Sequence, residues 1–288
     1  MTEPLHRDVP GSPPLHYLEW QPPSGPSGVP VLFVHGLLTH AAHWGPMAAA
    51  LAGGSLRAAP RRCVAPDLRG RGLSAAPKAG YRVADHVADI ERVVAAAGLE
   101  RFLLVGFSVG AAYAAAYTAA CAGVPGRVAG LVVGDYPART RGFGPAVREQ
   151  YLAEPVRFDG WAEAKAFFRQ RISFSDAYWE QVKGDLLHEL PDGSVVRWYA
   201  PEAVRGLMAE MDDTESWGAL VAPGRPLLVL QGGASKALSA EQAERYRALG
   251  ARVVTIAGVG HDVFAMAPRE CLRELRDLLF WLDAMPGQ

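Results

Sequence analysis

Gly106 and Gly110 flank Ser108 in the pattern Gly-x-Ser-x-Gly, which places a hydroxyl group between two residues that lack side chains. The apolar run 101–105 before this pattern is typical of a strand, and the alanine-rich run 111–117 after it is typical of a helix. A serine between a strand and a helix lies in a sharp turn, where only glycine avoids clashes with close neighbours. The start of the helix favours negative charge that develops on a substrate. We therefore interpret Ser108 as a candidate nucleophile.

The second candidate is a base that could remove the proton from Ser108. A serine hydroxyl is a poor nucleophile without such a base, which is most often a histidine held by a carboxylate. Among the eight histidines of the chain, His261 follows the last expected strand, 252–256. The carboxyl ends of parallel strands lie along one edge of a sheet, so His261 and Ser108 are expected at the same edge.

The composition favours a folded cytoplasmic protein. Half of the 288 residues are hydrophobic and 20% are charged, so a large core can form. The net charge is −1 without a basic stripe, which argues against nucleic acid and membrane partners. The first residues lack the pattern of a signal peptide, and no apolar run is long enough to span a membrane. Cys63, Cys121 and Cys271 lie far apart, as is typical of reduced, buried thiols in the cytoplasm.

Strands and helices alternate along most of the chain, which predicts an α/β fold. The expected strands are 15–20, 31–34, 62–65, 101–105, 128–133, 227–230 and 252–256, and the expected helices are 44–51, 83–97, 111–117, 240–249 and 269–282. Residues 1–14 are expected to form a loosely held arm. The alternation stops in an aromatic-rich stretch, so we predict an α/β core of residues 1–137 and 219–288 that is interrupted by a helical insertion of residues 138–218.

Four motifs together resemble the α/β-hydrolase fold of the capped serine-hydrolase type. They are His35-Gly36 after one strand, the run Asp-Leu-Arg-Gly-Arg-Gly-Leu-Ser at 67–74 after the next, the turn at Ser108, and Gly260-His261 near the end. The resemblance implies a mostly parallel central sheet flanked by helices, with the insertion as a helical cap. It also implies that Ser108 is the nucleophile and that His261 is the base.

By the same resemblance, the backbone N–H groups of Leu37 and Val109 would form an oxyanion hole. His35 is expected to orient the loop that carries Leu37. Asp67 is expected to fix a tight turn through local hydrogen bonds rather than to take part in the chemistry.

The acid of the triad cannot be at its usual position in this chain, because that position holds no carboxylate. Most members of the family carry the acid after the seventh strand, where this chain has Ser235 and Lys236 in the loop 231–239. A minority carry it after the sixth strand, and Asp135 follows that strand here. We choose Asp135, although an aspartate that only caps this turn is the other interpretation. The remaining alternatives are Glu241, Asp262, Asp212 and Asp213.

These residues predict a cofactor-independent serine hydrolase that acts on a small apolar or aromatic ester, lactone or thioester through an acyl-enzyme. No residue spacing suggests a metal site, and no nucleotide-binding glycine pattern follows the first strand, so neither a metal nor a cofactor is expected. A small-molecule substrate is the expected partner. The sequence does not distinguish a monomer from a homodimer.

Two other functions stay open. The acid after the sixth strand is also similar to that of cofactor-free dioxygenases that open N-heteroaromatic rings, in which a His–Asp pair deprotonates the substrate. A natural-product cyclase is a related possibility. The second is a non-catalytic protein that binds a small apolar ligand, since a fold does not fix a function.

Overall fold

The computed structural model describes residues 2–54, 59–137, 145–170, 175–210 and 225–285. Its centre is a sheet of eight strands in the order β1-β2-β4-β3-β5-β6-β10-β11. These strands are β1 (Leu5–Val9), β2 (Leu15–Trp20), β3 (Val31–Val34), β4 (Cys63–Pro66), β5 (Phe102–Phe107), β6 (Val128–Gly134), β10 (Leu227–Gly232) and β11 (Arg252–Ile256). β2 runs antiparallel to both of its neighbours, and the remaining pairs are parallel. The sheet is therefore mostly parallel, as predicted.

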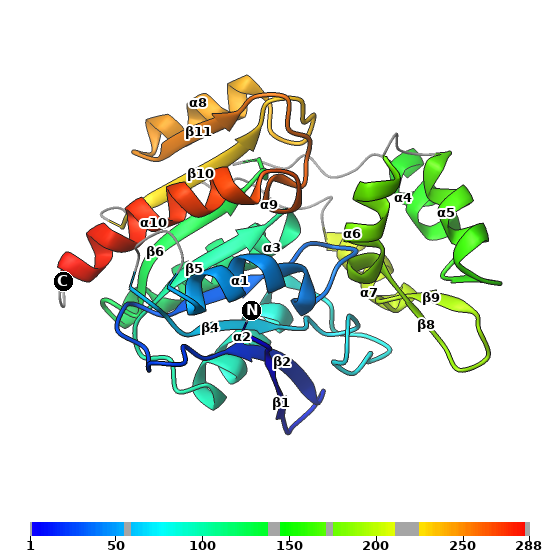
Figure 1. The fold of residues 1–288 in the computed structure, drawn as a ribbon, viewed down its shortest axis with the longest axis horizontal. Coiled ribbons are helices and arrows are strands. Elements are labelled where there is room, and N and C mark those ends of the chain that lie inside the picture. Colours follow the sequence, from blue (N-terminus) through cyan, green and yellow to red (C-terminus); the bar gives the residue numbers. More distant parts are fainter. Residues whose placement is uncertain (1, 55–58, 138–144, 171–174, 211–224, 286–288) are drawn as a thin grey trace.

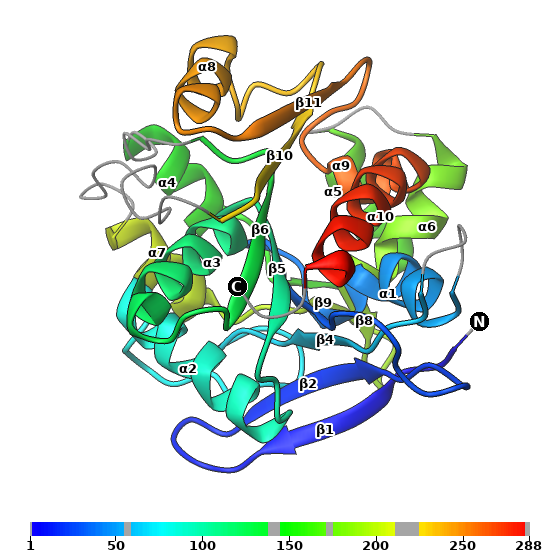
Figure 2. The ribbon, with the colours of Figure 1, turned by 90° about the vertical axis from the view of Figure 1, so that its left-hand side faces the viewer.

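Helices cover both faces of this sheet (Figure 2). One face carries α2 (Val83–Ala96), α3 (Val109–Ala120) and α8 (Ala240–Ala248), and the other carries α1 (Gly45–Ala52) and α10 (Pro268–Ala284). Each face has its own cluster of buried apolar side chains. Because both faces are covered, the central strands are apolar along their whole length, which explains why they were predictable. Short helices η1 (Ala41–Trp44), η3 (Cys121–Gly123) and α9 (Val263–Met266) lie in the connections.

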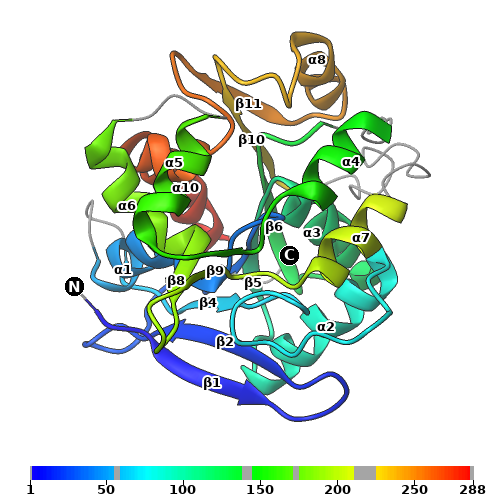
Figure 3. The ribbon, with the colours of Figure 1, turned by 90° about the vertical axis from the view of Figure 1, so that its right-hand side faces the viewer.

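The segment between β6 and β10 forms an insertion that lies across one end of the sheet (Figures 1 and 3). It contains α4 (Pro145–Ala153), β7 (Arg157–Phe158), α5 (Trp161–Arg169), α6 (Asp176–Leu186), β8 (Leu187–Glu189), β9 (Val195–Arg197) and α7 (Pro201–Glu210). The three strands form a small antiparallel sheet that was not predicted. Phe158, Phe168 and Trp179 belong to a separate apolar cluster of this insertion. The boundaries expected at residues 138 and 218 lie outside the described residues.

The amino-terminal segment corrects one expectation, because residues 5–9 form strand β1 instead of a loose arm. β1 pairs with β2 in an antiparallel hairpin in which Val9 lies opposite Leu15. Four of its five side chains are exposed, so it lacks the apolar pattern that marks a buried strand. Arg7 also donates to Glu19 of β2 at 3.0 Å. Backbone pairing and this cross-strand contact hold a strand that hydrophobicity alone does not reveal.

Within the described residues, no helix combines the length and the apolar character that crossing a membrane requires. The three cysteines are free and buried, and burial raises the pKa of Cys271 to about 12. The thiol of Cys271 is therefore protonated and unreactive at neutral pH.

Candidate active site

Ser108 lies in the turn between β5 and α3, in a backbone conformation that side chains rarely adopt. Its φ is 52° and its ψ is −130°. The Ser108 N–H donates to the carbonyl oxygen of Gly134 at 2.9 Å, which fastens the turn to the end of β6. A non-glycine residue at positive φ persists only where the surroundings enforce it. The fold therefore holds the Ser108 hydroxyl in one strained position.

The two glycines beside Ser108 allow this turn to pack against its neighbours. A Cβ atom at Gly106 would lie 2.4 Å from the Cα atom of Ala111. At Gly110 it would lie 2.4 Å from the carbonyl oxygens of both Val34 and His35. Backbone atoms cannot move aside as a flexible side chain can, so both positions exclude any larger residue. The steric reason given for this pattern from the sequence is confirmed.

His261 lies in the loop between β11 and α9, and its ring reaches Ser108. The Nε2 atom is 3.0 Å from the Ser108 Oγ atom. The ring of Phe107 supports the imidazole, with 5.1 Å between the ring centroids. The His261 side chain is 44% exposed, so one side of the pair faces open space. The Nε2 atom is placed to accept the hydroxyl proton.

Asp135 follows β6 and completes a chain of hydrogen bonds with these two residues. Its Oδ2 atom is 2.8 Å from His261 Nδ1, and its side chain is fully buried. Like Ser108, Asp135 has a positive φ, at 45°. Its N–H donates to the carbonyl oxygen of Leu230 at 2.8 Å, which holds it beside β10. The contact fixes the tautomer in which Nδ1 carries the proton and Nε2 is free to accept one.

The alternative acids lie elsewhere or in other contacts. Glu241 is in the first turn of α8 and pairs with Arg245 at 2.9 Å. Asp262 caps α9 by accepting from the Ala265 N–H at 3.1 Å. Asp212 and Asp213 lie outside the described residues. Among the described acidic residues, Asp135 is therefore the one whose carboxylate meets the Nδ1 atom of His261. Its catalytic role stays a prediction.

Leu37 and Val109 both line the cavity beside Ser108. Val109 is the first residue of α3, and the first N–H groups of a helix have no partner within the helix.

The loop of Leu37 is held from behind by His35. The His35 Nδ1 atom donates to the Gly36 carbonyl oxygen at 2.8 Å, and its Nε2 atom accepts from the Leu68 N–H at 3.0 Å. Burial lowers the pKa of His35 to about 3, so its ring is neutral and can donate and accept at once.

Asp67 makes the local hydrogen bond expected of it, to Leu73, and also makes two hydrogen bonds to distant segments. Its buried carboxylate accepts from the N–H groups of Ala41 and Leu73 and from His16, at 2.7, 2.9 and 2.7 Å. Burial alone would raise the pKa of Asp67, but these hydrogen bonds lower it below its ordinary value. The carboxylate therefore stays charged while it ties the turn after β4 to η1.

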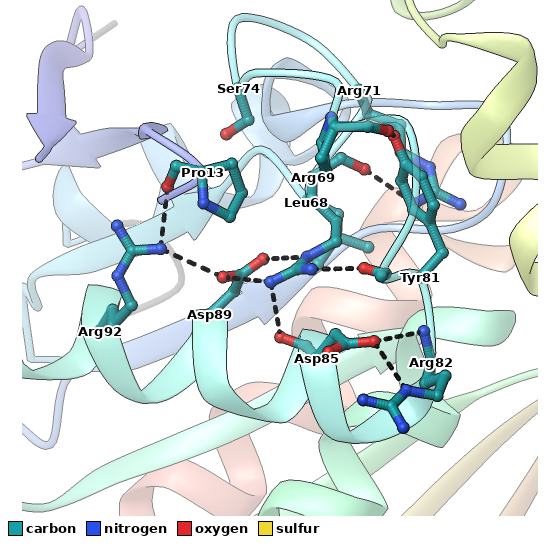
Figure 4. Close-up of polar contacts among 12 residues, drawn as sticks. Pro13, Leu68, Arg69, Arg71, Ser74, Tyr81, Arg82, Asp85, Asp89 and Arg92 are labelled. Atoms are coloured by element: carbon teal, nitrogen blue, oxygen red, sulfur yellow. Dashed lines mark hydrogen bonds and ion pairs between the residues drawn. The ribbon is translucent and has the colours of Figure 1, made fainter. Parts of the chain in front are cut away.

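Arg69, two residues later, anchors the same turn to α2 (Figure 4). Its guanidinium group binds both carboxylate oxygens of Asp89, at 2.6 and 2.8 Å. Arg92 donates to the same carboxylate at 3.3 Å and to the Pro13 carbonyl oxygen at 2.9 Å. Figure 4 shows Arg69 and Arg92 both reaching Asp89, and Arg92 also reaching Pro13. The motif at 67–74 is thus anchored to α2, and its Leu68 N–H supports His35 behind the loop of Leu37.

A cavity of about 640 Å³ opens above Ser108 and His261. Core side chains such as Phe107 and Tyr136 line one part of it, and Tyr151, Tyr178 and Leu207 of the insertion line another. Burial, followed by the nearby carboxylates of Asp262 and Asp185, raises the pKa of Tyr178 to about 12, so its hydroxyl stays protonated. None of the described lining residues is lysine or arginine. A cavity of this kind suits an uncharged, largely apolar ligand.

The model of the Alpha/beta hydrolase family matches residues 31–274, from the start of β3 to the middle of α10. This match covers most of the chain and includes the turn at Ser108, the loop of Asp135 and the loop of His261. The chain belongs to the alpha/beta hydrolase family. The expectation drawn from the four sequence motifs is thereby confirmed at the level of the fold and the family.

Several solved structures have the same fold over nearly their whole length. A hydrolase of E-2-(acetamidomethylene)succinate is 24% identical with a TM-score of 0.78, and the alignment covers 96% of this chain and 98% of that one. An alpha/beta hydrolase from Novosphingobium aromaticivorans DSM 12444 is 24% identical with a TM-score of 0.80, covering 97% and 99%. An enol-lactonase from Burkholderia xenovorans LB400 is 18% identical with a TM-score of 0.71, covering 96% and 100%. At these identities the likeness concerns the fold alone.

A second histidine, His43, joins the insertion to the loop of His261. It is buried, with Nδ1 3.5 Å from Asp185 of α6 and Nε2 3.5 Å from Asp262. Burial alone would lower the pKa of His43, but the two carboxylates raise it above its ordinary value. The structure buries His43 beside Phe107, with 5.4 Å between the ring centroids. No local pattern signals such a contact between distant segments.

Among the described residues, no three His, Cys, Asp or Glu side chains converge in a way that could hold a metal ion. Ser235 was noted in the sequence only because it stands where a carboxylate was expected. Its hydroxyl donates to the Oδ2 atom of Asp135.

Proposed function

We propose that this protein is a cofactor-independent serine hydrolase in which Ser108, His261 and Asp135 act as a catalytic triad. The observation that carries the proposal is the pair of contacts at the base of the cavity, 3.0 Å from His261 Nε2 to Ser108 Oγ and 2.8 Å from Nδ1 to Asp135 Oδ2. Both distances are in the range over which a proton can be transferred or held. The buried carboxylate would stabilise the imidazolium that forms when the hydroxyl loses its proton.

The proposed reaction has two halves. In the first, His261 takes the proton of Ser108 while Oγ bonds to the substrate carbonyl carbon, and the carbonyl oxygen becomes negative beside the N–H groups of Leu37 and Val109. The carbonyl then re-forms, the bond to the leaving group breaks, and His261 gives that group its proton. In the second, His261 takes a proton from water, the hydroxide attacks the acyl-enzyme, and Ser108 recovers its proton as the acid is released.

The proposed substrates are small apolar or aromatic esters, lactones or thioesters. Phe107, Tyr136, Tyr151 and Tyr178 line the cavity with aromatic surface, and aromatic rings bury apolar ligands well. The phenol of Tyr178 is a hydrogen-bond donor that could orient a substrate oxygen. We also propose that the insertion serves as a cap, because it contributes part of the cavity wall.

Activity toward a panel of acyl esters, lactones and thioesters tests the proposal. We expect the wild-type protein to turn over at least one class, and Ser108→Ala and His261→Ala to lower kcat roughly 10⁴-fold or more. Ser27→Ala, which changes an exposed serine outside the cavity lining, serves as the matched control and should behave as wild type. Turnover that survives in Ser108→Ala would contradict the proposal and favour non-hydrolytic chemistry on the His–Asp pair. Tight ligand binding without any turnover would favour a binding protein.

A further inference from the structure

The carboxylate of Asp135 receives three hydrogen bonds although it is fully buried. Its Oδ1 atom accepts from the Gly232 N–H at 3.0 Å. Its Oδ2 atom accepts from His261 Nδ1 at 2.8 Å and also from the hydroxyl of Ser235. The same oxygen that would hold the histidine is therefore shared with a serine from another loop.

The direction of the Ser235 hydrogen bond to Asp135 follows from the chemistry of the two groups. The Ala237 N–H donates to the Ser235 Oγ atom at 3.1 Å, which uses the oxygen as an acceptor. An ionised carboxylate can only accept, so the hydroxyl proton of Ser235 must point to Asp135. A serine that merely shaped this turn would need only the contact with Ala237. The second contact, to Asp135, needs another explanation.

The loop that carries Ser235 is packed firmly against the loop that carries His261. The Ala234 N–H donates to the Val259 carbonyl oxygen at 2.8 Å, and the Ser235 N–H donates to the Gly232 carbonyl oxygen at 3.0 Å. A Cβ atom at Gly232 would lie 2.1 Å from the Gly260 carbonyl oxygen, so the two loops approach as closely as their backbones allow. This packing fixes the distance from Ser235 to the carboxylate that faces His261.

We propose that Ser235 is a positioning residue that holds the Asp135 carboxylate toward His261 and shares its negative charge, an inference that rests on the proposed function. The hydroxyl keeps Oδ2 from rotating away from the imidazole. It also draws charge from that oxygen, because a hydrogen bond to a carboxylate offsets part of its charge. Without the hydroxyl, the carboxylate would be less well placed and would attract a protonated imidazole more strongly.

Kinetics of Ser235→Ala as a function of pH test this inference. We expect kcat to fall roughly ten- to hundredfold with little change in KM, since the lost contact is one hydrogen bond to a charged group. We also expect the acidic limb of the kcat/KM profile to move to higher pH by roughly half a unit or more, because the protonated imidazole gains stability. Ser235→Thr keeps the hydroxyl and should stay within about threefold of wild type.

Two further variants separate positioning from a structural effect. Ser239→Ala removes the serine that caps α8 in the same connection and should leave the pH profile unmoved. Ser235→Cys keeps the side-chain size but offers only a weak donor, so it should lose activity as Ser235→Ala does even if the alanine variant folds poorly. Thermal unfolding of each variant is measured alongside.

The outcomes distinguish this inference from the proposed function. If wild type hydrolyses a substrate but Ser235→Ala matches it in kcat and in pH profile, the inference alone is wrong. A fall in kcat without movement of the acidic limb, or an equal fall in Ser239→Ala, would likewise assign Ser235 a merely structural role. If wild type hydrolyses nothing in the panel while remaining folded, the proposed function itself fails.

Discussion

Ser108 and Asp135 are the two non-glycine residues with positive φ among the described residues. Such conformations cost about 1–3 kcal/mol each, so the surrounding structure must enforce them. Both residues end a strand and both turn a side chain toward His261. Strain concentrated on two groups of one hydrogen-bonded chain is typical of a functional site. The backbone geometry and the side-chain contacts with His261 therefore single out the same two residues, Ser108 and Asp135.

The Asp135→Asn variant tests the acid. We expect kcat to fall by about 10³- to 10⁴-fold, because an amide nitrogen facing Nδ1 favours the tautomer in which Nε2 carries the proton. Steady-state kinetics check this result, with Asp277→Asn, which changes an exposed aspartate, as the control. Full activity in Asp135→Asn would overturn the assignment of the acid.

The Gly110→Ala variant tests the packing of the turn. The added methyl group would meet backbone oxygens at 2.4 Å, so we expect a loss of about 1–3 kcal/mol of unfolding free energy together with most of the activity. Gly123→Ala is the matched control, since a Cβ atom there has no neighbour within 4 Å. Denaturant unfolding measures both variants. Equal stability of the two variants would show that the turn tolerates a side chain.

Among the helices and strands, those whose own residues show an apolar or periodic pattern were predicted from the sequence. β5, the turn and α3 combine an apolar run, flanking glycines and an alanine-rich helix within twenty residues, and the structure matches this prediction closely. β1 was missed because its side chains are mostly exposed and its partner strand supplies the stabilising contacts. β7, β8 and β9 were missed because strands of two or three residues are too short to show a periodic pattern.

The candidate site likewise has residues that could be predicted from the sequence and contacts that could not. The position of His261 after the last strand follows from topology, so it could be predicted from chain order. The hydrogen bond from Ser235 to Asp135 joins residues that are 100 positions apart, and nothing local marks it. His43 likewise meets Asp185 and Asp262 only after the insertion has packed on the core. Contacts between distant loops depend on tertiary structure and leave no periodic trace.

His43 gives a pH-dependent prediction for the contact between α6 and the loop after β11. Its pKa is raised in the folded protein above the unfolded value of about 6.5, so the stabilisation is fully present below pH 6.5 and is lost as pH rises through the folded pKa. His43→Gln should therefore cost about 1–3 kcal/mol of unfolding free energy near pH 6 and less near pH 9. Denaturant unfolding at both pH values checks this. A pH-independent difference would exclude a charged His43.

At the scale of the whole molecule, the insertion and the core share one cavity. The core supplies the candidate reacting groups, and α4, α6 and α7 supply Tyr151, Tyr178 and Leu207 to its wall. A fold by itself does not select a substrate. We expect that selection to depend on the side chains of the insertion.

Tyr178→Ala tests this division of roles. We expect KM for aromatic acyl esters to rise roughly tenfold because the ring loses apolar contact with the substrate, while kcat for short acyl esters stays close to that of wild type. Steady-state kinetics with matched aromatic and acetyl esters measure both values. If Tyr178→Ala lowers kcat equally for both esters, the insertion acts on the chemistry rather than on selection.

Covalent labelling by a fluorophosphonate, followed by intact mass and peptide mapping, measures whether His261 activates the hydroxyl of Ser108. A serine activated by His261 should take up one label per chain, on Ser108, and the label should be absent from Ser108→Ala. In His261→Ala the rate of labelling should fall by several orders of magnitude, because the base is gone. A wild-type protein that is catalytically active but unlabelled, or that is labelled equally fast without His261, would contradict the account.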